Sequence, residues 1–380
     1  MERVEVLVVG GGPAGSSCAY ALRRCGIEVA VLDRAQFPRD KVCAGWITPP
    51  VLRALGVAPA DYAKDGRVLQ PIRGFAVAPR GGPGAVADCG EVVSYGIRRC
   101  ELDHFLLSRS GARLHLGEPL EALRRDGADW VANERIRARW LVGAGGHFCP
   151  VARHLGARPG ETEPSTVVAR EIEFEMTPAQ QARCPVRPEL PALFFEPDLR
   201  GYGWVVRKGD WLNVGLGRQD ARAFPAHVAG FADWLVGEGL VPPDLPGRWR
   251  GHAYLLHAET PRPLAAPGVL LAGDAAGSAY AMSGEGIRPA VESGLLAARA
   301  LVGALREGRE HADAGSRYTR DVLARFGPRY GRVRPGLSGW LPARARARVA
   351  ARFLATAWLV RRVVVERWFL HREVPGIASG

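Results

Sequence analysis

Apolar residues at the start of the chain follow a pattern that predicts alternating strands and a helix. Residues 4–9 form a β-branched apolar run, residues 16–24 follow as a helical stretch, and residues 27–32 form a second apolar run. Continuous apolar runs of this length are typical of strands in a parallel sheet that is buried on both faces. The opening segment therefore predicts a β-α-β unit.

A glycine-rich turn joins the first strand to the helix, and an acidic residue ends the second strand. The turn has the spacing GxGxxG, which permits a tight bend, lets a pyrophosphate approach the backbone and lets helix and strand pack closely. Phosphates would then lie at the helix N-terminus, where free N–H groups favour negative charge. Asp33 stands 18 residues after Gly15, where a carboxylate can accept hydrogen bonds from ribose hydroxyls. The predicted dinucleotide-binding residues are Gly10, Gly12, Pro13, Ala14, Gly15, Asp33 and Arg34.

A second strand-to-helix turn, late in the chain, indicates which dinucleotide binds. An apolar strand over residues 269–272 runs into a Gly-Asp turn, and a second glycine-rich loop precedes a helix over residues 288–305. These segments resemble the FAD-binding oxidoreductases of the p-hydroxybenzoate hydroxylase type. The resemblance implies FAD rather than NAD as the resident cofactor, with a positive helix end beside the flavin. It assigns cofactor contacts to Gly273, Asp274, Gly284, Glu285, Gly286 and Ile287, although Asp274 as an ordinary helix cap is the alternative.

Two segments between these ends resemble the same superfamily. Residues 95–103 match its arginine and following helix start, which implies that Arg99 lies near FAD; a surface arginine paired with Glu101 or Asp103 is the alternative. Residues 140–147 match a strand and turn in which Gly145 stands where the superfamily has aspartate. In the hydroxylases that aspartate lies on the nicotinamide approach. The electron donor is therefore left open between NAD(P)H and another external reductant.

The segment after the second strand narrows the resemblance to one family. Residues 37–49 resemble the PRxKxCGG segment of the geranylgeranyl reductase family, flavoenzymes that reduce isoprenoid double bonds. Arg39, Lys41 and Cys43 match this segment, whereas Ala44 stands where glycine is usual. The resemblance implies that the segment lies along the flavin, with Cys43 at the active site. A small buried hydrophobe is the alternative for a free cysteine.

A predicted hairpin carries the second family motif. Residues 201–208 and 211–217 form alternating strands around a Lys-Gly-Asp turn. They resemble the reductase family's YxWxFP motif and the strand after it, which implies that Tyr202 and Trp204 line the substrate cavity. Alternation places these two side chains and Val206 on one face, so a core-facing aromatic stripe is the alternative. Val206 and Arg207 replace the family's Phe and Pro, which leaves the substrate open.

These matches predict an FAD-dependent oxidoreductase of geranylgeranyl reductase type, which reduces C=C bonds of an isoprenoid or other hydrophobic lipid substrate. The candidate catalytic and pocket residues are Cys43, Tyr202 and Trp204. A flavin monooxygenase acting on an aromatic or polyketide-like substrate shares the FAD motifs and is the rival enzyme class. A non-catalytic flavin-binding partner is a third class, for which no motif argues.

The predicted fold is α/β, with a discontinuous Rossmann-type FAD-binding domain over residues 1–65, 95–160 and 255–305. Residues 66–94 and 161–254 are expected to form a mostly antiparallel substrate domain, with strands at residues 73–78 and 92–97. Residues 306–380 are expected to form a C-terminal helical region.

Charge and composition add expectations about partners and location. The net charge is +12, and only three of the 51 basic residues are lysines. The arginines are spread along the chain without the clustering that nucleic-acid binding needs, so no nucleic-acid partner is expected. Arg344, Arg346, Arg348 and Arg352 precede an aromatic-rich helix over residues 353–370, which could lie on a membrane surface or pack on the FAD domain. Seven dispersed cysteines, no signal peptide and no long apolar run predict a cytoplasmic protein, and the basic C-terminal helix adds membrane association as an alternative location. No metal-ligand spacing occurs, so no metal is expected.

Overall fold

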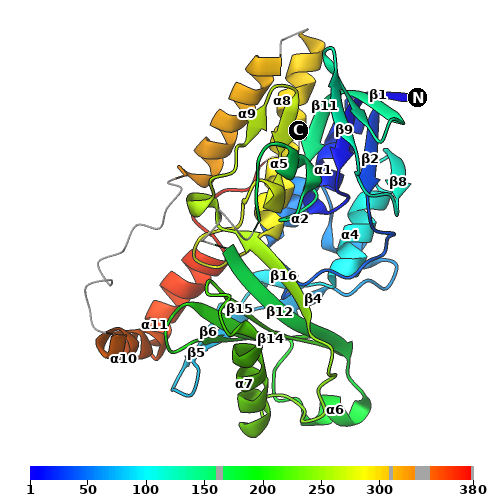
Figure 1. Ribbon diagram of the computed structural model, residues 1–380. Coiled ribbons are helices and arrows are strands. Elements are labelled where there is room, and N and C mark those ends of the chain that lie inside the picture. The colour runs from blue at the N-terminus through cyan, green and yellow to red at the C-terminus, as the bar shows by residue number, and fades with distance from the viewer. Residues whose placement is uncertain (160–165, 308–310, 330–342, 378–380) are drawn as a thin grey trace.

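The computed structural model describes residues 1–159, 166–307, 311–329 and 343–377, with the side chains of residues 312 and 343–347 excepted. Figure 1 shows two parts, a sheet flanked by helices above and a second sheet below. This arrangement confirms the predicted α/β class and the mostly antiparallel second sheet. Parts of the predicted domains lie outside the described residues, namely residues 160–165, 308–310, 330–342 and 378–380.

The upper sheet has a parallel centre made of aliphatic strands. Its strands are β1 (Glu2–Val9), β2 (Val29–Asp33), β8 (Arg113–Leu116), β9 (Leu123–Asp126), β10 (Asp129–Ala132), β11 (Ile136–Gly143), β17 (Ala265–Ala266) and β18 (Val269–Leu271). Strands β8, β2, β1, β11 and β18 follow one another in parallel, and β17 and the β9–β10 hairpin add antiparallel edges. Val6, Leu7 and Val8 of β1 are wholly buried, as the continuous apolar run predicts.

Two helices on this sheet pack tightly against each other: α1 (Pro13–Arg24) and α8 (Ile287–Arg306). A Cβ on Gly294 of α8 would come within 2.2 Å of the carbonyl oxygen of Ala14. Glycine there lets the N-terminal turn of α1 lie directly on α8. The upper part also contains α2 (Pro49–Leu55), α3 (Pro59–Ala63), α4 (Arg99–Ser108), α5 (Pro150–His154), α9 (His311–Phe326) and the 3-10 turns η1 (His257–Glu259) and η2 (Gly273–Ala275).

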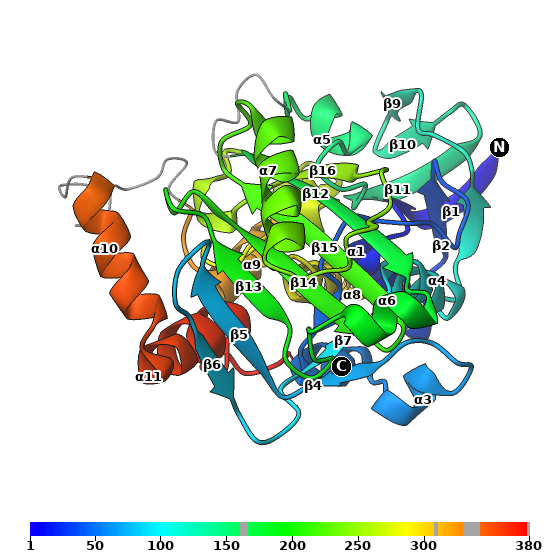
Figure 2. The same ribbon diagram turned by 90° about the horizontal axis from the view of Figure 1, so that it is seen from below.

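The lower sheet has one face covered by a helix and the other turned toward the upper part. Its strands in spatial order are β16 (Arg250–Leu255), β12 (Thr166–Glu175), β15 (Trp211–Arg218), β14 (Gly201–Lys208), β13 (Ala192–Phe195), β5 (Gly74–Pro79) and β6 (Ala85–Asp88). Only the β13–β5 pair among these is parallel. Figure 2 shows α7 (Phe224–Gly237) lying across the outer face, with α6 (Pro178–Arg183) beyond it. The β14–β15 hairpin confirms the predicted one.

One strand prediction for the lower sheet is wrong. Residues 92–97 were expected to join it, but they form β7 (Ser94–Gly96) in a separate small sheet with β3 (Trp46–Ile47) and β4 (Gln70–Ile72). The hydroxyl of Ser94 donates a 2.8 Å hydrogen bond to the carbonyl of Ile47, which fixes β7 to the strand after Cys43. Strand β6 takes the place beside β5 instead.

The C-terminal region is helical where it is described, but it does not pack as expected. Instead of one helix over residues 353–370, the chain forms α10 (Ala343–Leu354), the short α11 (Ala357–Leu359) and the π-helical η4 (Val360–Phe369). Val364 and Phe369 of η4 are wholly buried in an apolar cluster with Phe75 and Trp204 of the lower sheet. Of the two alternatives for this helix, the structure differs from packing on the FAD domain, because the apolar face of η4 covers β5 and β6 of the lower sheet. No helix among the described residues is both long and apolar enough to cross a bilayer.

Candidate cofactor and substrate site

A cavity of about 580 Å³ lies between the two parts of the molecule. The glycine turn after β1 and the N-terminus of α8 form its upper wall, and β14 and β16 contribute to its lower wall. All but one of the predicted site residues line it, namely Gly10, Gly12, Pro13, Ala14, Asp33, Arg34, Cys43, Arg99, Tyr202, Trp204, Gly273, Asp274, Gly284, Glu285, Gly286 and Ile287. The exception is Gly15.

The three glycines of the first turn have different surroundings. Gly10 has φ +115°, and a Cβ there would lie 2.3 Å from the carbonyl oxygen of Ala144. A Cβ on Gly12 would point into the cavity, 3.5 Å from the guanidinium of Arg39. A Cβ on Gly15 would lie 1.8 Å from the carbonyl oxygen of Gly10, which explains why Gly15 is absent from the cavity wall. Gly12 is thus the position that leaves room for a ligand.

Asp33 closes the turn at the end of β2. Its carboxylate accepts hydrogen bonds from the backbone N–H groups of Gly11 at 2.7 Å and Ala35 at 2.9 Å. Each oxygen takes one of these bonds, so each retains a lone pair for a further donor. The side chain is therefore fixed at the cavity wall and can still accept bonds from a ribose.

The Gly-Asp turn before α8 is held from both parts of the molecule. Ser293 of α8 accepts a 2.9 Å hydrogen bond from the N–H of Gly273, and Nε2 of His252 on β16 lies 3.1 Å from Oδ2 of Asp274. Burial, together with the charge of Lys41, lowers the pKa of His252 to about 4. Burial acts to raise the pKa of Asp274, but His252 and Lys41 outweigh it and hold that pKa below its usual value.

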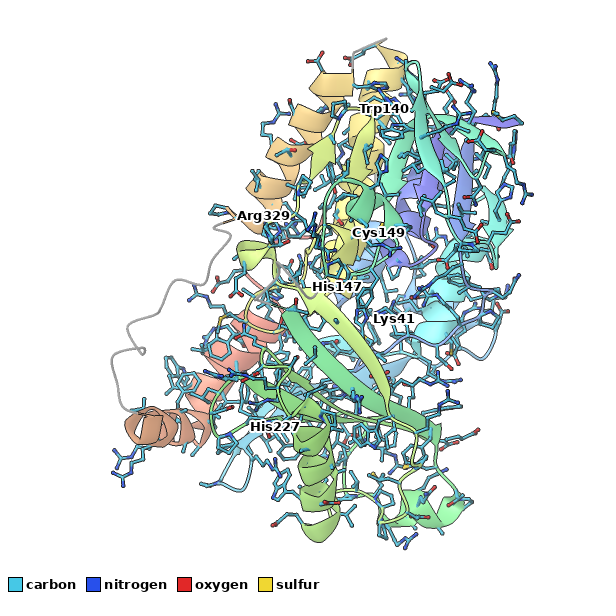
Figure 3. All side chains as sticks on the ribbon, in the orientation of Figure 1. Lys41, Trp140, His147, Cys149, His227 and Arg329 are labelled. Carbon is cyan, nitrogen blue, oxygen red and sulfur yellow. The ribbon has the colours of Figure 1, made fainter. Side chains whose placement is uncertain are left out.

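Positive groups surround the same space. Arg99 is buried and binds Asp103 through two hydrogen bonds of 2.9 and 2.8 Å, so the pairing alternative is right about its partner but not about a surface position. Lys41 makes no hydrogen bond or ion pair with any described residue, and burial lowers its pKa to about 8. Figure 3 labels Lys41 between the upper and lower parts. An unpaired cation at this position suits an anionic ligand.

These features fit FAD. Helices α1 and α8 begin at glycines without a side-chain cap, so their first N–H groups remain available for anions at the cavity. The pyrophosphate would bind at Gly12 and α1, the ribose at Asp33, and the flavin ring near the N-terminus of α8. When bound, the cofactor supplies hydride transfer, and the partial positive charge of α8 would stabilise its reduced, anionic form.

A buried network holds Cys43 against the lower sheet. The backbone N–H of Cys43 donates a 2.7 Å hydrogen bond to Glu171 of β12, and its carbonyl accepts one of 3.1 Å from Asn213 of β15. The thiol lies near the guanidinium of Arg99 and accepts a weak 3.4 Å bond from the N–H of Gly45. Cys43 lines the cavity, so it is not simply a buried hydrophobe. Sequence reasoning did not identify Glu171 or Asn213.

The aromatic residues of β14 lie beside this network. The indole N–H of Trp204 donates a 2.7 Å hydrogen bond to Oδ1 of Asn213, and the hydroxyl of Tyr202 donates to the carbonyl of Ser283. The ring of Tyr202 meets that of Phe369 edge-on at 5.4 Å. Tyr202, Trp204 and Val206 share one apolar cluster, so the predicted common face is confirmed. The stripe is part of the core, and its two aromatic rings also reach the cavity.

Comparison with known proteins places this geometry in a family context. The model of a family described as FAD binding domain matches residues 3–324. The chain is 31% identical over 253 residues to the menaquinone reductase of Mycobacterium tuberculosis, covering 60% of this chain and 58% of that protein. It is 28% identical over 344 residues to digeranylgeranylglycerophospholipid reductase 1 of Methanopyrus kandleri, covering 83% and 84%.

A solved structure shares the fold over almost the whole chain. A geranylgeranyl bacteriochlorophyll reductase-like protein from Thermoplasma acidophilum superposes with a TM-score of 0.77 at 19% identity, covering 98% of each chain. At this identity the similarity shows the fold alone. The match to the menaquinone reductase of Mycobacterium tuberculosis covers little more than half of that protein's length.

Proposed function

The chain belongs to the FAD-binding domain family, and we propose that it reduces C=C bonds of a hydrophobic, isoprenoid-type substrate with hydride from reduced flavin. It is an FAD-dependent oxidoreductase of the geranylgeranyl reductase type. The observation that carries the substrate proposal is the pair of hydrogen bonds that Asn213 makes, one with Cys43 and one with Trp204. These two bonds connect the two segments that resemble the reductase family at one wall of the cavity.

The two parts of the molecule provide separate walls of the cavity, one for the cofactor and one for the substrate. We assign FAD to the upper part, at the glycine turn and α8, and the substrate to the face of the lower sheet. Tyr202, Trp204 and Tyr254 of that face, together with Trp46 of β3, give the cavity aromatic walls. Such walls exclude water and hold an apolar chain next to the flavin, which raises the probability of hydride transfer. The relatives named for lipids and menaquinone support a substrate with a polyprenyl chain.

Anaerobic flavin spectroscopy tests this proposal. Purified holoenzyme is reduced with dithionite, and the flavin absorbance is followed after adding digeranylgeranylglycerophospholipid or menaquinone in detergent micelles. We expect reoxidation together with a product two hydrogens heavier, and no reoxidation with the fully saturated lipid. Unchanged reduced flavin with both lipids would overturn the proposal. A transient flavin adduct seen only after admitting air would favour the monooxygenase.

The electron donor can be identified with the same oxidised holoenzyme. Gly145 stands where the hydroxylases have an aspartate on the nicotinamide approach, and a Cβ there would contact Cys149 at 3.3 Å. We therefore infer that the donor is an external reductant other than NAD(P)H. Anaerobic NADPH and NADH should leave the oxidised flavin spectrum unchanged within the turnover time, whereas rapid bleaching by either would overturn this inference.

We also propose that the C-terminal face contacts an anionic membrane surface, which would supply the lipid. Trp358 of α11 is 65% exposed, and Val349 of α10 is exposed nearby in sequence. Exposed arginines accompany them at Arg348, Arg352, Arg361 and Arg362. Basic side chains around exposed apolar ones match the chemistry of an anionic bilayer interface.

Vesicle sedimentation tests the membrane contact. The protein should sediment with phosphatidylglycerol vesicles at low salt and remain in solution with phosphatidylcholine vesicles. Trp358→Ala should reduce the bound fraction, whereas Leu199→Ala, which removes an exposed leucine of the lower sheet's loops, should not. Equal sedimentation of wild type and Trp358→Ala would overturn the assignment of this face.

A further inference from the structure

Glu285 is a buried carboxyl group beside the N-terminus of α8. Glu285 lines the cavity and immediately precedes Gly286, the N-cap residue of α8. The residue is only 8% exposed, and neither carboxyl oxygen has a hydrogen-bond partner among the described residues. A buried carboxylate without partners is strongly destabilising, and such groups at a cavity are candidates for function.

The charged groups around Glu285 are occupied with other partners or are too distant to neutralise it. Arg288, on the first turn of α8, donates to Glu292 at 3.0 Å and to the carbonyl of Val374 at 2.7 Å. Glu292 in turn binds Arg325 of α9 at 2.6 Å. Arg288 is thereby fixed between α8 and the C-terminal segment, and it makes no ion pair with Glu285.

A histidine from the C-terminal segment faces the same carboxyl group. Nε2 of His371 lies 3.9 Å from Oε2 of Glu285 and has no hydrogen-bond partner of its own among the described residues. The His371 ring stacks on Tyr280 with 3.7 Å between centroids. A water molecule or a small shift would complete a path from His371 to Glu285.

The environment keeps Glu285 protonated and His371 neutral at neutral pH. Burial raises the pKa of Glu285 to about 8, although the charge of Arg288 opposes this; the charge of Glu292 adds to it. Burial, together with the charges of Arg288 and Arg325, lowers the pKa of His371 to about 4. Tyr202 faces the carboxyl from β14, and burial keeps its phenol neutral by raising its pKa. A neutral carboxylic acid at a cavity can donate a proton.

We propose that Glu285 is the acid that protonates the substrate carbon next to the one that receives hydride. The inference rests on the proposed reductase function and names the proton donor that this function requires. Hydride from the reduced flavin supplies the electron pair for one new C–H bond. The electrons of the C=C π bond take the proton of Glu285 to form the other. The carboxylate left behind regains a proton from water through His371, and the net reaction consumes reduced flavin, alkene and one solvent proton.

The protonation state of Glu285 can be measured without turnover. Infrared difference spectra of oxidised holoenzyme, recorded against pH, should contain a carboxylic acid carbonyl band that titrates near pH 8. The band should be absent in Glu285→Gln and present in Glu238→Gln, which alters an exposed glutamate at the end of α7. Because Glu171 titrates in the same range, the Glu285→Gln difference is the decisive one. Identical spectra of the Glu285→Gln variant and wild type would overturn the inference.

Single-turnover oxidation by digeranylgeranylglycerophospholipid in D₂O separates the acid from the reductase proposal. In the Glu285→Gln variant the lipid should oxidise the reduced flavin about a hundredfold or more slowly than in wild type. The variant should also lose the fall in rate above pH 8 and place deuterium on both faces of the carbon. Glu285→Asp, which keeps an acid, should recover much of the rate. If wild type does not oxidise, the reductase function fails. If Glu285→Gln matches wild type in rate, pH profile and deuterium placement, the acid role fails while that function stands.

Discussion

Asn213 donates a 3.1 Å hydrogen bond to the carbonyl oxygen of Cys43, although 170 positions separate them in sequence. The same side chain accepts the indole N–H of Trp204 at 2.7 Å. One amide therefore satisfies groups from the segment after β2 and from β14, and it does so in a buried position. This side chain therefore links the backbone of Cys43 directly to the aromatic wall.

Replacing this amide should destabilise the protein. Asn213→Ala leaves the Trp204 N–H and the Cys43 carbonyl without partners, which should lower the free energy of unfolding by about 2–4 kcal/mol. Trp204→Phe removes only the hydrogen bond of the indole N–H, so its loss of hydrogen bonding should lower the free energy of unfolding by less than Asn213→Ala does. Urea denaturation of the holoprotein measures both changes. An Asn213→Ala variant as stable as wild type would show that the network is not needed to hold the two segments.

Two glycines of the first turn should respond differently to the same substitution. In Gly12→Ala the new methyl group enters the cavity, so apoprotein stability should change by less than about 1 kcal/mol while FAD binds about tenfold or more weakly. In Gly15→Ala the methyl group meets the carbonyl of Gly10, so the folded yield itself should fall. Circular dichroism melts and FAD fluorescence titration distinguish the two effects. Equal FAD affinity of wild type and Gly12→Ala would remove the turn from the binding site.

The role of Cys43 can be separated from packing by truncating its thiol. Cys43→Ala should retain bound FAD, because the thiol makes none of the contacts assigned to the phosphates or ribose, yet turnover should fall about tenfold. Cys25→Ala, at an exposed position after α1, provides the control and should behave as wild type. Unchanged turnover of Cys43→Ala would show that the thiol has no role in the reaction and that Cys43 serves only in packing.

Local signals explain why most of the site could be predicted from the sequence. The turns at Gly10 and Gly273 combine an apolar strand, fixed glycine spacing and a helix within about 30 residues, so the chain itself specifies the geometry. The hairpin that presents Tyr202 and Trp204 is local too, because a tight turn at Gly209 joins its strands. All of the predicted site residues except Gly15 line one cavity.

The parts that the sequence did not predict depend on contacts between distant segments. Glu173 alternates with apolar residues in β12 as a solvent-facing acid would, but pairing with β15 places it opposite Asn213 and within 2.6 Å of buried Lys208. His371, which faces Glu285 at 3.9 Å, follows 86 positions later and comes close to it only because η4 packs on the lower sheet. Neither composition nor periodicity predicts which strands and helices lie side by side in the folded protein.

Glu171 offers a prediction about pH and stability. It is 5% exposed, and burial raises the pKa of its carboxyl to about 8, although the N–H of Cys43 and the charge of Lys208 act to lower it. In the unfolded chain the same carboxyl returns to about 4.5. Between these two pH values the folded protein holds a proton that the unfolded chain releases. Stability therefore falls as pH rises through this window.

Glu171→Gln should cancel this dependence, because its amide resembles the protonated acid and does not titrate. Relative to wild type, the variant should gain stability as pH rises from 5 to 8, by at most about 4–5 kcal/mol, with no further gain above pH 8. Comparing variant with wild type at each pH removes the similar contribution of Glu285, which both proteins share. Denaturant unfolding at pH 5, 7 and 9 measures the difference, and Glu238→Gln, exposed on α7, should keep a constant offset. Parallel curves for Glu171→Gln and wild type would mean that Glu171 is ionised throughout, with the Cys43 N–H and Lys208 outweighing its burial.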